Sequence, residues 1–278
     1  MSEWFSGDVV ADGIRIHYWR TGGEGPPVVL SHGITDNGLC WTRLARALED
    51  AYDVIMPDAR GHGFSDAPEE GHSPEGRAAD LAGLIRALGL EEPRPVLVGH
   101  SMGAETTAAA AAGYPELGRC AILEDPPWWA DGPVLSPAER AARAEEWRAD
   151  LIERKSQARE EIVAFCRAQH PAWAEVECGP WADSKLQVNF NVLKALAAPR
   201  PPWQGVVRRI TCPVLLITAD PALGSIVTPE VAREAAGLCR NVKVVHIPGA
   251  GHNIRREQFE KYVDVVTAFL VEVQAAQV

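Results

Sequence analysis

The sequence has 278 residues, 46% of them hydrophobic and 23% charged, which is typical of globular proteins and excludes a disordered chain. Its formal net charge of −11 argues against nucleic acid or an anionic membrane as a partner, because both bind basic surfaces. This length allows one large α/β domain, or such a core with a smaller domain inserted into it.

The first half of the chain alternates short apolar runs with helical patterns. Strands are predicted at residues 14–19, 28–31, 52–56, 96–98 and 120–123. Helices are predicted between them at residues 41–48, 76–89 and 101–113. Because apolar strands that alternate with helices are buried on both faces, this order predicts an α/β fold with a mostly parallel central sheet and helices on both faces.

The pattern changes after residue 127. Residues 128–205 contain no strand signal, and the first of their helical stretches begins at the capping box Ser136-Pro137-Ala138-Glu139. Six of the nine tryptophans fall in this segment, which ends at a proline-rich stretch. Strands are predicted again at residues 213–218 and 242–247, and a last helix at about 256–272. We therefore predict a helical cap or lid at residues 128–205, inserted into a core formed by residues 1–127 and 206–278.

The most informative stretch is residues 96–104, where three apolar β-formers lead into Gly99-His100-Ser101-Met102-Gly103 and an alanine-rich helix. This is the strand, sharp turn and helix of a nucleophile elbow, in which strained backbone lifts a serine out of the packing. The flanking positions have to be glycine, because a Cβ there would collide with the neighbouring strand or helix. Ser101 is therefore the candidate nucleophile.

A serine hydroxyl needs a base that takes its proton, and open α/β sheets bind ligands beyond the carboxyl ends of their strands. His252 meets this requirement, because it follows the last predicted strand in a glycine-rich loop. His32, His62 and His100 also lie in glycine-rich loops and are interpreted as residues that shape those loops. No pair of histidines has the spacing of metal ligands, so we expect no metal and no cofactor.

Together these features resemble the α/β-hydrolase family over essentially the whole chain. The matching motifs are His32-Gly33, residues 58–65, residues 99–103 and residues 248–252. The resemblance implies a serine hydrolase in which Ser101 is the nucleophile and His252 is the general base. It also implies an oxyanion hole formed by the backbone amides of Ile34 and Met102.

The acid of the triad is where the sequence departs from the family's common pattern. Most members place an aspartate after the strand that matches residues 215–217, in a Gly-x-x-Asp loop, but here alanine occupies both positions and Asp220 lies two residues too early. A minority of the family carries the acid after the preceding strand, where Glu124 and Asp125 stand. Either strand end can supply a carboxylate to the imidazole. We favour Asp125, with Asp220 and Glu124 as the alternatives.

Two tryptophans, Trp128 and Trp129, follow the proposed acid; at least one of them is predicted to line the mouth of the pocket, and both are candidates for binding substrate. Aromatic walls with few charges favour an apolar or aromatic substrate over a sugar or a phosphate. Lys185 and Arg200 are candidates for orienting a polar group, although nothing in the sequence singles one out.

We therefore expect a hydrolase that cleaves a carboxylic ester or lactone of a small, partly hydrophobic molecule through an acyl-enzyme. A carbon–carbon or amide-bond hydrolase with the same triad, a cofactor-free perhydrolase and a non-catalytic ligand receptor are the alternatives. Dehalogenase and epoxide hydrolase are disfavoured, because both reactions need an aspartate in place of Ser101.

The expected partner is a small-molecule substrate, with no nucleic acid and no membrane, and we expect a monomer or a homodimer. Six scattered cysteines without a CxxC pair indicate reduced thiols, and the N-terminal residues lack the features of a signal peptide. No stretch approaches the ~18 apolar residues of a membrane span. These features predict a cytoplasmic protein.

Overall fold

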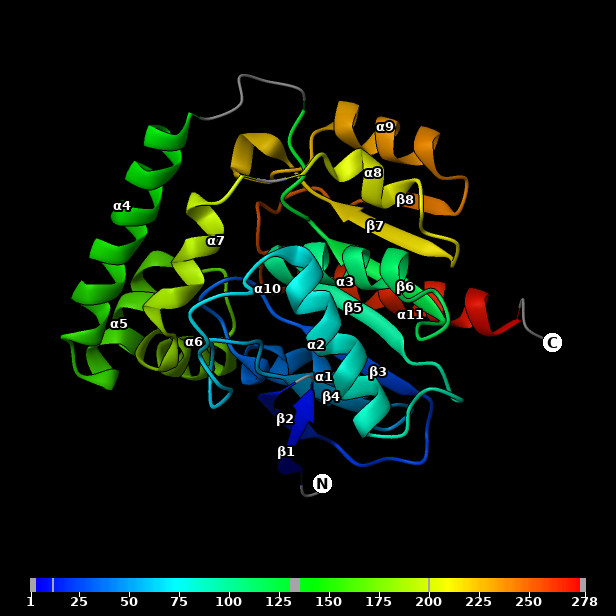
Figure 1. Cartoon of the computed structure of the whole chain (residues 1–278), viewed down its shortest axis with the longest axis horizontal. Helices are drawn as coiled ribbons and strands as arrows, with labels where there is room; N and C mark the ends of the chain where they lie inside the picture. Colours follow the sequence, from blue (N-terminus) through cyan, green and yellow to red (C-terminus); the bar gives the residue numbers. More distant parts are fainter. Residues whose placement is uncertain (1–3, 12, 131–135, 200, 276–278) are drawn as a thin grey trace.

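The computed structural model describes residues 4–11, 13–130, 136–199 and 201–275. Its central element is an eight-stranded sheet in the order β1-β2-β4-β3-β5-β6-β7-β8, covered by helices (Figure 1). The strands are β1 (Phe5–Ala11), β2 (Ile14–Arg20), β3 (Pro27–Ser31), β4 (Asp53–Pro57), β5 (Val96–His100), β6 (Cys120–Glu124), β7 (Val214–Thr218) and β8 (Val242–His246). The α/β fold predicted from the sequence is confirmed.

Strands β3 to β8 run parallel to one another, while β1 and β2 add an antiparallel edge. The register places Ser31 opposite Gly99 and His100 opposite Glu124, so β3, β5 and β6 end side by side. Because the carboxyl ends of parallel strands meet at one edge of the sheet, the loops that follow them gather there. This edge carries the candidate site residues.

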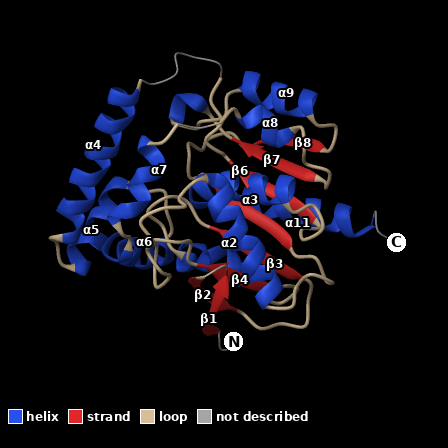
Figure 2. Cartoon of the chain, in the orientation of Figure 1, coloured by secondary structure: helices blue, strands red, loops and turns tan. Residues whose placement is uncertain are grey.

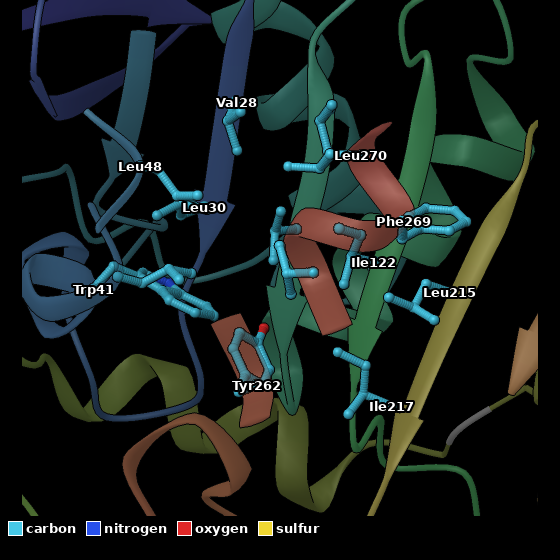
Figure 3. Packing of buried hydrophobic residues seen from close by; sticks show 14 of the residues in the cluster. Val28, Leu30, Trp41, Leu48, Ile122, Leu215, Ile217, Tyr262, Phe269 and Leu270 are labelled. Atoms are coloured by element: carbon cyan, nitrogen blue, oxygen red, sulfur yellow. The ribbon is translucent and has the colours of Figure 1, made fainter. Parts of the chain in front are cut away.

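Helices surround the sheet, as Figure 2 shows with helices in blue and strands in red. Those of the core are α1 (Thr42–Leu48), α2 (Pro74–Ala87), α3 (Met102–Gly113), α9 (Pro229–Leu238), α10 (Ile254–Glu257) and α11 (Phe259–Ala275), with the 3-10 turns η1 (Gly38–Trp41) and η3 (Pro221–Leu223). Alternate strand residues face opposite sides of a sheet. Every residue of β3 to β7 is buried, so both faces of these strands are covered. Figure 3 shows one side, where Tyr262 and Phe269 of α11 pack in a cluster with Ile122 and Leu215.

Between β6 and β7 the chain forms helices instead of strands. They are α4 (Pro137–Lys155), α5 (Arg159–Gln169), α6 (Glu175–Gln187), the 3-10 turn η2 (Phe190–Leu193), α7 (Lys194–Ala197) and α8 (Trp203–Val207). We call α4 to α7 the inserted helices, and they lie together on one side of the sheet, at the left in Figure 1. The predicted capping box is present, because Ser136 Oγ accepts from the Glu139 amide at 3.2 Å and Glu139 accepts from the Ser136 amide at 2.7 Å. Residues 131–135 and Arg200 of the predicted cap lie outside the described residues.

Two elements differ from the prediction. The sequence pattern misses β1, because most of its side chains are exposed or half-buried and Gly7 interrupts its apolar run. The single helix predicted at 256–272 is divided into α10 and α11 at Gln258, which has φ −130° and ψ 54°. The Gln258 side chain donates to the carbonyl oxygen of Gly249 at 3.0 Å, and this hydrogen bond joins the α10–α11 connection to the loop before His252.

All six cysteines are buried free thiols, as expected. In the described ranges, no helix has the length and apolar character needed to cross a membrane. Nor do three or more His, Cys, Asp or Glu side chains of those ranges group as metal ligands would.

Candidate active site

A cavity of about 1120 Å³ lies at the carboxyl-end edge of the sheet, lined by both the core and the inserted helices. The core contributes Ile34, Ser101, Met102 and His252 to its walls. The inserted helices and their connections contribute Trp147, Trp173, Trp181 and Lys185. The cavity therefore brings the predicted nucleophile and base together with an aromatic wall.

Ser101 stands at the turn between β5 and α3, with φ 52° and ψ −118°. This left-handed backbone is strained for a residue with a side chain, and such strain is typical of functional sites. A Cβ on Gly99 would lie 2.2 Å from the Gly103 carbonyl oxygen, and one on Gly103 would lie 2.0 Å from the Ser31 carbonyl oxygen. Both distances are far inside van der Waals contact, so the prediction that these positions require glycine is confirmed.

The imidazole of His252 contacts the carboxylate of Asp125, with 2.7 Å between His252 Nδ1 and Asp125 Oδ2. Asp125 directly follows β6 and has a left-handed backbone, with φ 42°. Its carboxylate is fully buried and also accepts hydrogen bonds from the Ser225 hydroxyl at 2.8 Å and from the Val227 amide at 2.9 Å. The carboxylate is thus held by the β7–α9 connection as well as by β6.

The other two candidate acids are engaged elsewhere. Asp220 accepts from the Gly249 amide at 2.7 Å and lies 2.9 Å from His246 Nε2. Glu124 accepts from the Arg255 amide at 2.9 Å, and burial raises the pKa of its carboxyl group. Of the three carboxylates, the one that reaches His252 is Asp125.

The amides of Ile34 and Met102, which the resemblance implies as the oxyanion hole, belong to two different segments. Met102 is the first residue of α3, and the first N–H groups of a helix have no acceptor within it. Ile34 lies in the loop after β3 and, like Met102, lines the cavity. The next residue, Thr35, has φ 64° and donates its own amide to His62 Nε2 at 3.3 Å. The loop is thus fixed next to the Ile34 amide.

Three histidines in glycine-rich loops bind main-chain groups, as predicted. Nδ1 of His32 donates to the Gly33 carbonyl at 2.8 Å, Nδ1 of His62 to the Arg60 carbonyl at 2.9 Å, and Nε2 of His100 to the His252 carbonyl at 2.9 Å. Burial lowers the pKa of each of these imidazoles below its ordinary value of 6.5. These three imidazoles are therefore neutral hydrogen-bonding groups at neutral pH. The contact with Asp125 is made by a different histidine, His252.

The two tryptophans predicted to bind substrate lie in different environments. Trp129 lines the cavity and is 42% exposed. Trp128 is buried and stacks on Trp203, with ring centroids 5.1 Å apart, in the cluster between β6, β7 and α8. Trp128 is therefore corrected as a substrate-binding candidate, because its ring packs in the core, and Trp129 is the one of the two that lines the cavity.

A buried group of charges in the cavity wall contains Lys185, a candidate for orienting a polar group, together with residues that the sequence analysis does not single out. Asp36 lies 3.3 Å from Lys185 Nζ and 3.0 Å from an Arg256 nitrogen, and Arg256 also contacts Glu177 at 3.3 Å. Burial alone would raise the pKa of Asp36, but Arg256 and Lys185 hold it well below its ordinary value. In the sequence, the pair Arg255-Arg256, directly after the His252 loop, is the feature that could have indicated this group of charges. In the structure, the pair belongs to α10, a helix of four residues.

A model of the alpha/beta hydrolase family matches residues 28–265 of the chain. The chain belongs to this family. The resemblance found in the motifs is thereby confirmed, and the protein is a hydrolase.

The hydrolase is 30% identical to the 2-(acetamidomethylene)succinate hydrolase of Mesorhizobium japonicum over 261 residues, which cover 90% of each chain. It is also 30% identical to the N-formylmaleamate deformylase of Pseudomonas putida over 282 residues, which cover 95% of this chain and 96% of the relative. The solved structure of E-2-(acetamidomethylene)succinate hydrolase matches with a TM-score of 0.80 at 26% identity, over 96% of this chain and 99% of that one.

Proposed function

We propose that this hydrolase cleaves a carboxylic ester or lactone of a small, partly hydrophobic molecule, with Ser101 as nucleophile, His252 as general base and Asp125 as the acid. The observation that carries the proposal is the 2.7 Å contact of His252 Nδ1 with Asp125 Oδ2, in a cavity that Ser101 and His252 both line. A carboxylate on Nδ1 favours the tautomer in which Nε2 is free to accept a proton.

In the proposed reaction, Ser101 Oγ attacks the carbonyl carbon while its proton passes to His252 Nε2. The negative charge on the carbonyl oxygen is stabilised by the N–H groups of Ile34 and Met102. The imidazolium then protonates the leaving oxygen, and the acyl group remains on Ser101. Water, deprotonated by the same imidazole, releases the carboxylic acid and restores the serine hydroxyl.

We also propose that residues 128–205 act as the cap over this site and select the substrate. Trp147, Trp173 and Trp181 of this segment line the cavity, and their rings supply apolar surface. This aromatic side of the cavity suits a small, partly hydrophobic acyl or alcohol group, while Asp36, Lys185 and Arg256 give the same cavity a charged side.

Amide-bond hydrolysis is the second candidate, and the comparisons favour it. The two relatives that match at 30% identity over nearly the whole chain are a 2-(acetamidomethylene)succinate hydrolase and an N-formylmaleamate deformylase. The same three residues serve an amide, because the step that differs is protonation of the leaving group, where the imidazolium protonates a nitrogen instead of an oxygen.

The experiment has two parts. A fluorophosphonate probe is expected to label the wild type and not Ser101→Ala, and failure to label the wild type would overturn the proposal in favour of a ligand receptor. A turnover screen with a matched 4-nitrophenyl ester, lactone and 4-nitroanilide of each acyl group then ranks the bonds. If the anilides were cleaved faster, amide hydrolysis would take the place of ester hydrolysis as the proposed function.

A further inference from the structure

The loop that carries the Ile34 amide, residues 33–37, is held by the inserted helices as well as by the core. We call it the oxyanion loop. The side chain of Ile34 packs against the apolar cluster of the inserted helices that contains Leu151. At the other end of the loop, Asn37 Nδ2 donates to Gln187 Oε1, at the end of α6, at 2.8 Å. The loop therefore depends on contacts that the core alone does not provide.

The strongest of these contacts is made by Lys185 of α6. Its Nζ lies 2.8 Å from the Thr35 carbonyl oxygen, 2.9 Å from Thr35 Oγ1 and 3.3 Å from Asp36 Oδ1. An ammonium group has three hydrogens, and all three acceptors belong to the oxyanion loop. Lys185 is 6% exposed, so water competes little for these bonds. Burial lowers the pKa of the ammonium group, and the Asp36 carboxylate opposes this effect.

Thr35 is the residue of the loop that most needs such support. A β-branched residue with φ 64° is in an unfavourable conformation, which persists only where the surroundings hold it. From the core side, His62 Nε2 accepts the Thr35 amide at 3.3 Å. From the side of the inserted helices, Lys185 of α6 binds the carbonyl and hydroxyl oxygens of Thr35. Because Ile34 directly precedes Thr35, a change at Thr35 alters the backbone that orients the Ile34 amide.

We propose that Lys185 is a positioning residue, which acts through Thr35 to keep the Ile34 amide directed at the oxygen that becomes charged in the reaction. The inserted helix α6 is then a fixed part of the catalytic site rather than a lid that leaves it. This inference rests on the proposed function, because it assumes that the reaction passes through an oxyanion. An interaction of this kind contributes more to the transition state than to bound substrate.

The test compares Lys185→Met with the wild type in single-turnover acylation by 4-nitrophenyl butyrate, which separates the acylation rate constant from substrate binding. We expect the rate constant to fall by ~10²-fold, with a dissociation constant within about threefold of the wild type, as for loss of an oxyanion-hole contact. The affinity for an aryl trifluoromethyl ketone, which forms an oxyanion when Ser101 adds to it, should fall by a similar factor.

The matched control is Lys155→Met. Lys155 Nζ also donates to a main-chain oxygen of α6, that of Leu186, at 2.5 Å, but the lysine belongs to α4 and does not contact the oxyanion loop. We expect Lys155→Met to leave the acylation rate constant and the ketone affinity near those of the wild type. Equal losses in the two variants, or a loss in Lys185→Met confined to substrate binding, would show that Lys185 only braces the fold.

A second variant approaches the contact from the loop, in case Lys185→Met does not fold. Thr35→Val removes the hydroxyl acceptor at nearly constant volume and leaves Lys185 its other two acceptors. We expect a smaller fall in the acylation rate constant, about tenfold, again without a change in substrate binding. An unchanged rate constant in Thr35→Val would overturn the inference. A wild type that neither labels nor acylates would instead refute the proposed function, and with it this role of Lys185.

Discussion

The carboxylate that contacts His252, that of Asp125, is held in place by three further donors. Its two oxygens accept from the Ser225 hydroxyl at 2.8 Å, the Ile226 amide at 2.8 Å and the Val227 amide at 2.9 Å, and His252 Nδ1 is the fourth donor, at 2.7 Å. A fully buried carboxylate with four donors has no freedom to rotate. The orientation of the imidazole is therefore set by β6 and the residues after η3, independently of substrate.

We expect Asp125→Asn to lower kcat by ~10⁴-fold, because an amide nitrogen facing Nδ1 favours the tautomer of His252 that cannot accept the serine proton. The variant should also be less stable, since the new amide group cannot accept from all of the donors around it, at a cost of ~1–3 kcal/mol for each one left unsatisfied. Steady-state kinetics on the fastest substrate of the screen and urea unfolding measure the two effects.

Asp220→Asn serves as the comparison for that variant. The carboxylate of Asp220 is engaged with His246 and with the Gly249 amide, so its loss reaches His252 only through the loop. We expect kcat within about twofold of the wild type, the scale of a surface substitution. If Asp220→Asn were the more damaging of the two changes, the assignment of the acid would be wrong.

Ser101 is held in a strained conformation, so removing its side chain should stabilise the fold. Both Ser101→Gly and Ser101→Ala are expected to abolish turnover, by a factor on the order of 10⁶. Glycine adopts φ 52° without strain, whereas alanine keeps its Cβ there. We therefore expect Ser101→Gly to have a free energy of unfolding about 1 kcal/mol above that of Ser101→Ala. Urea unfolding decides this, and equal stability of the two variants would show that the elbow is not strained.

The candidate nucleophile, Ser101, could be placed at an elbow because the requirements of that turn are local in the sequence. Gly99 and Gly103 mark two close approaches of backbone to backbone, and no other residue type fits either. His252 could be predicted because parallel strands bring their carboxyl ends to one edge, so a histidine after the last strand lies near the elbow. Local turns and the direction of strands are therefore sufficient for these two residues.

The sequence favours Asp125 but leaves Asp220 and Glu124 open, and it does not distinguish Trp128 from Trp129, because it does not show how side chains are directed where a strand ends. The left-handed backbone of Asp125, with φ 42°, directs its carboxylate to His252, and no residue type in the sequence signals that angle. Trp128 and Trp129 are neighbours, yet one ring stacks in the core and the other lines the cavity. The direction of a side chain that follows a strand end depends on how it packs, and a sequence pattern does not show this packing.

The contact of Lys185 with Thr35 joins residues 150 positions apart and leaves no pattern in either segment. The sequence makes Lys185 a candidate for orienting a polar group, but it does not indicate that the side chain is buried, because lysines are mostly exposed. Its burial results from the way α6 packs beside the loop after β3, and only the folded chain brings the two together.

The packing of the elbow can be tested at Gly103. A Cβ there would lie 2.0 Å from the Ser31 carbonyl oxygen, so we expect Gly103→Ala to lower the free energy of unfolding by about 2 kcal/mol or more and to displace Ser101. Gly237 in α9 is the matched control, because nothing lies within 4 Å of its added Cβ. Gly237→Ala should raise stability by ~0.5–1 kcal/mol, since alanine favours a helix over glycine. A Gly103→Ala protein as stable as the wild type in urea would contradict the close contact.

The last prediction concerns His62, whose Nε2 accepts the Thr35 amide and cannot do so when protonated. Burial holds its pKa well below the ordinary value of 6.5, which the unfolded chain retains. Below pH 6.5 the unfolded state therefore binds a proton that the folded state does not. The free energy of unfolding then decreases by up to about 1.4 kcal/mol for each unit by which the pH is lowered. His62→Gln removes this titration, so the stability advantage of the wild type over the variant, measured by urea unfolding, should shrink between about pH 7 and pH 5. An advantage that stays constant over this range would show that His62 titrates alike in the folded and unfolded states.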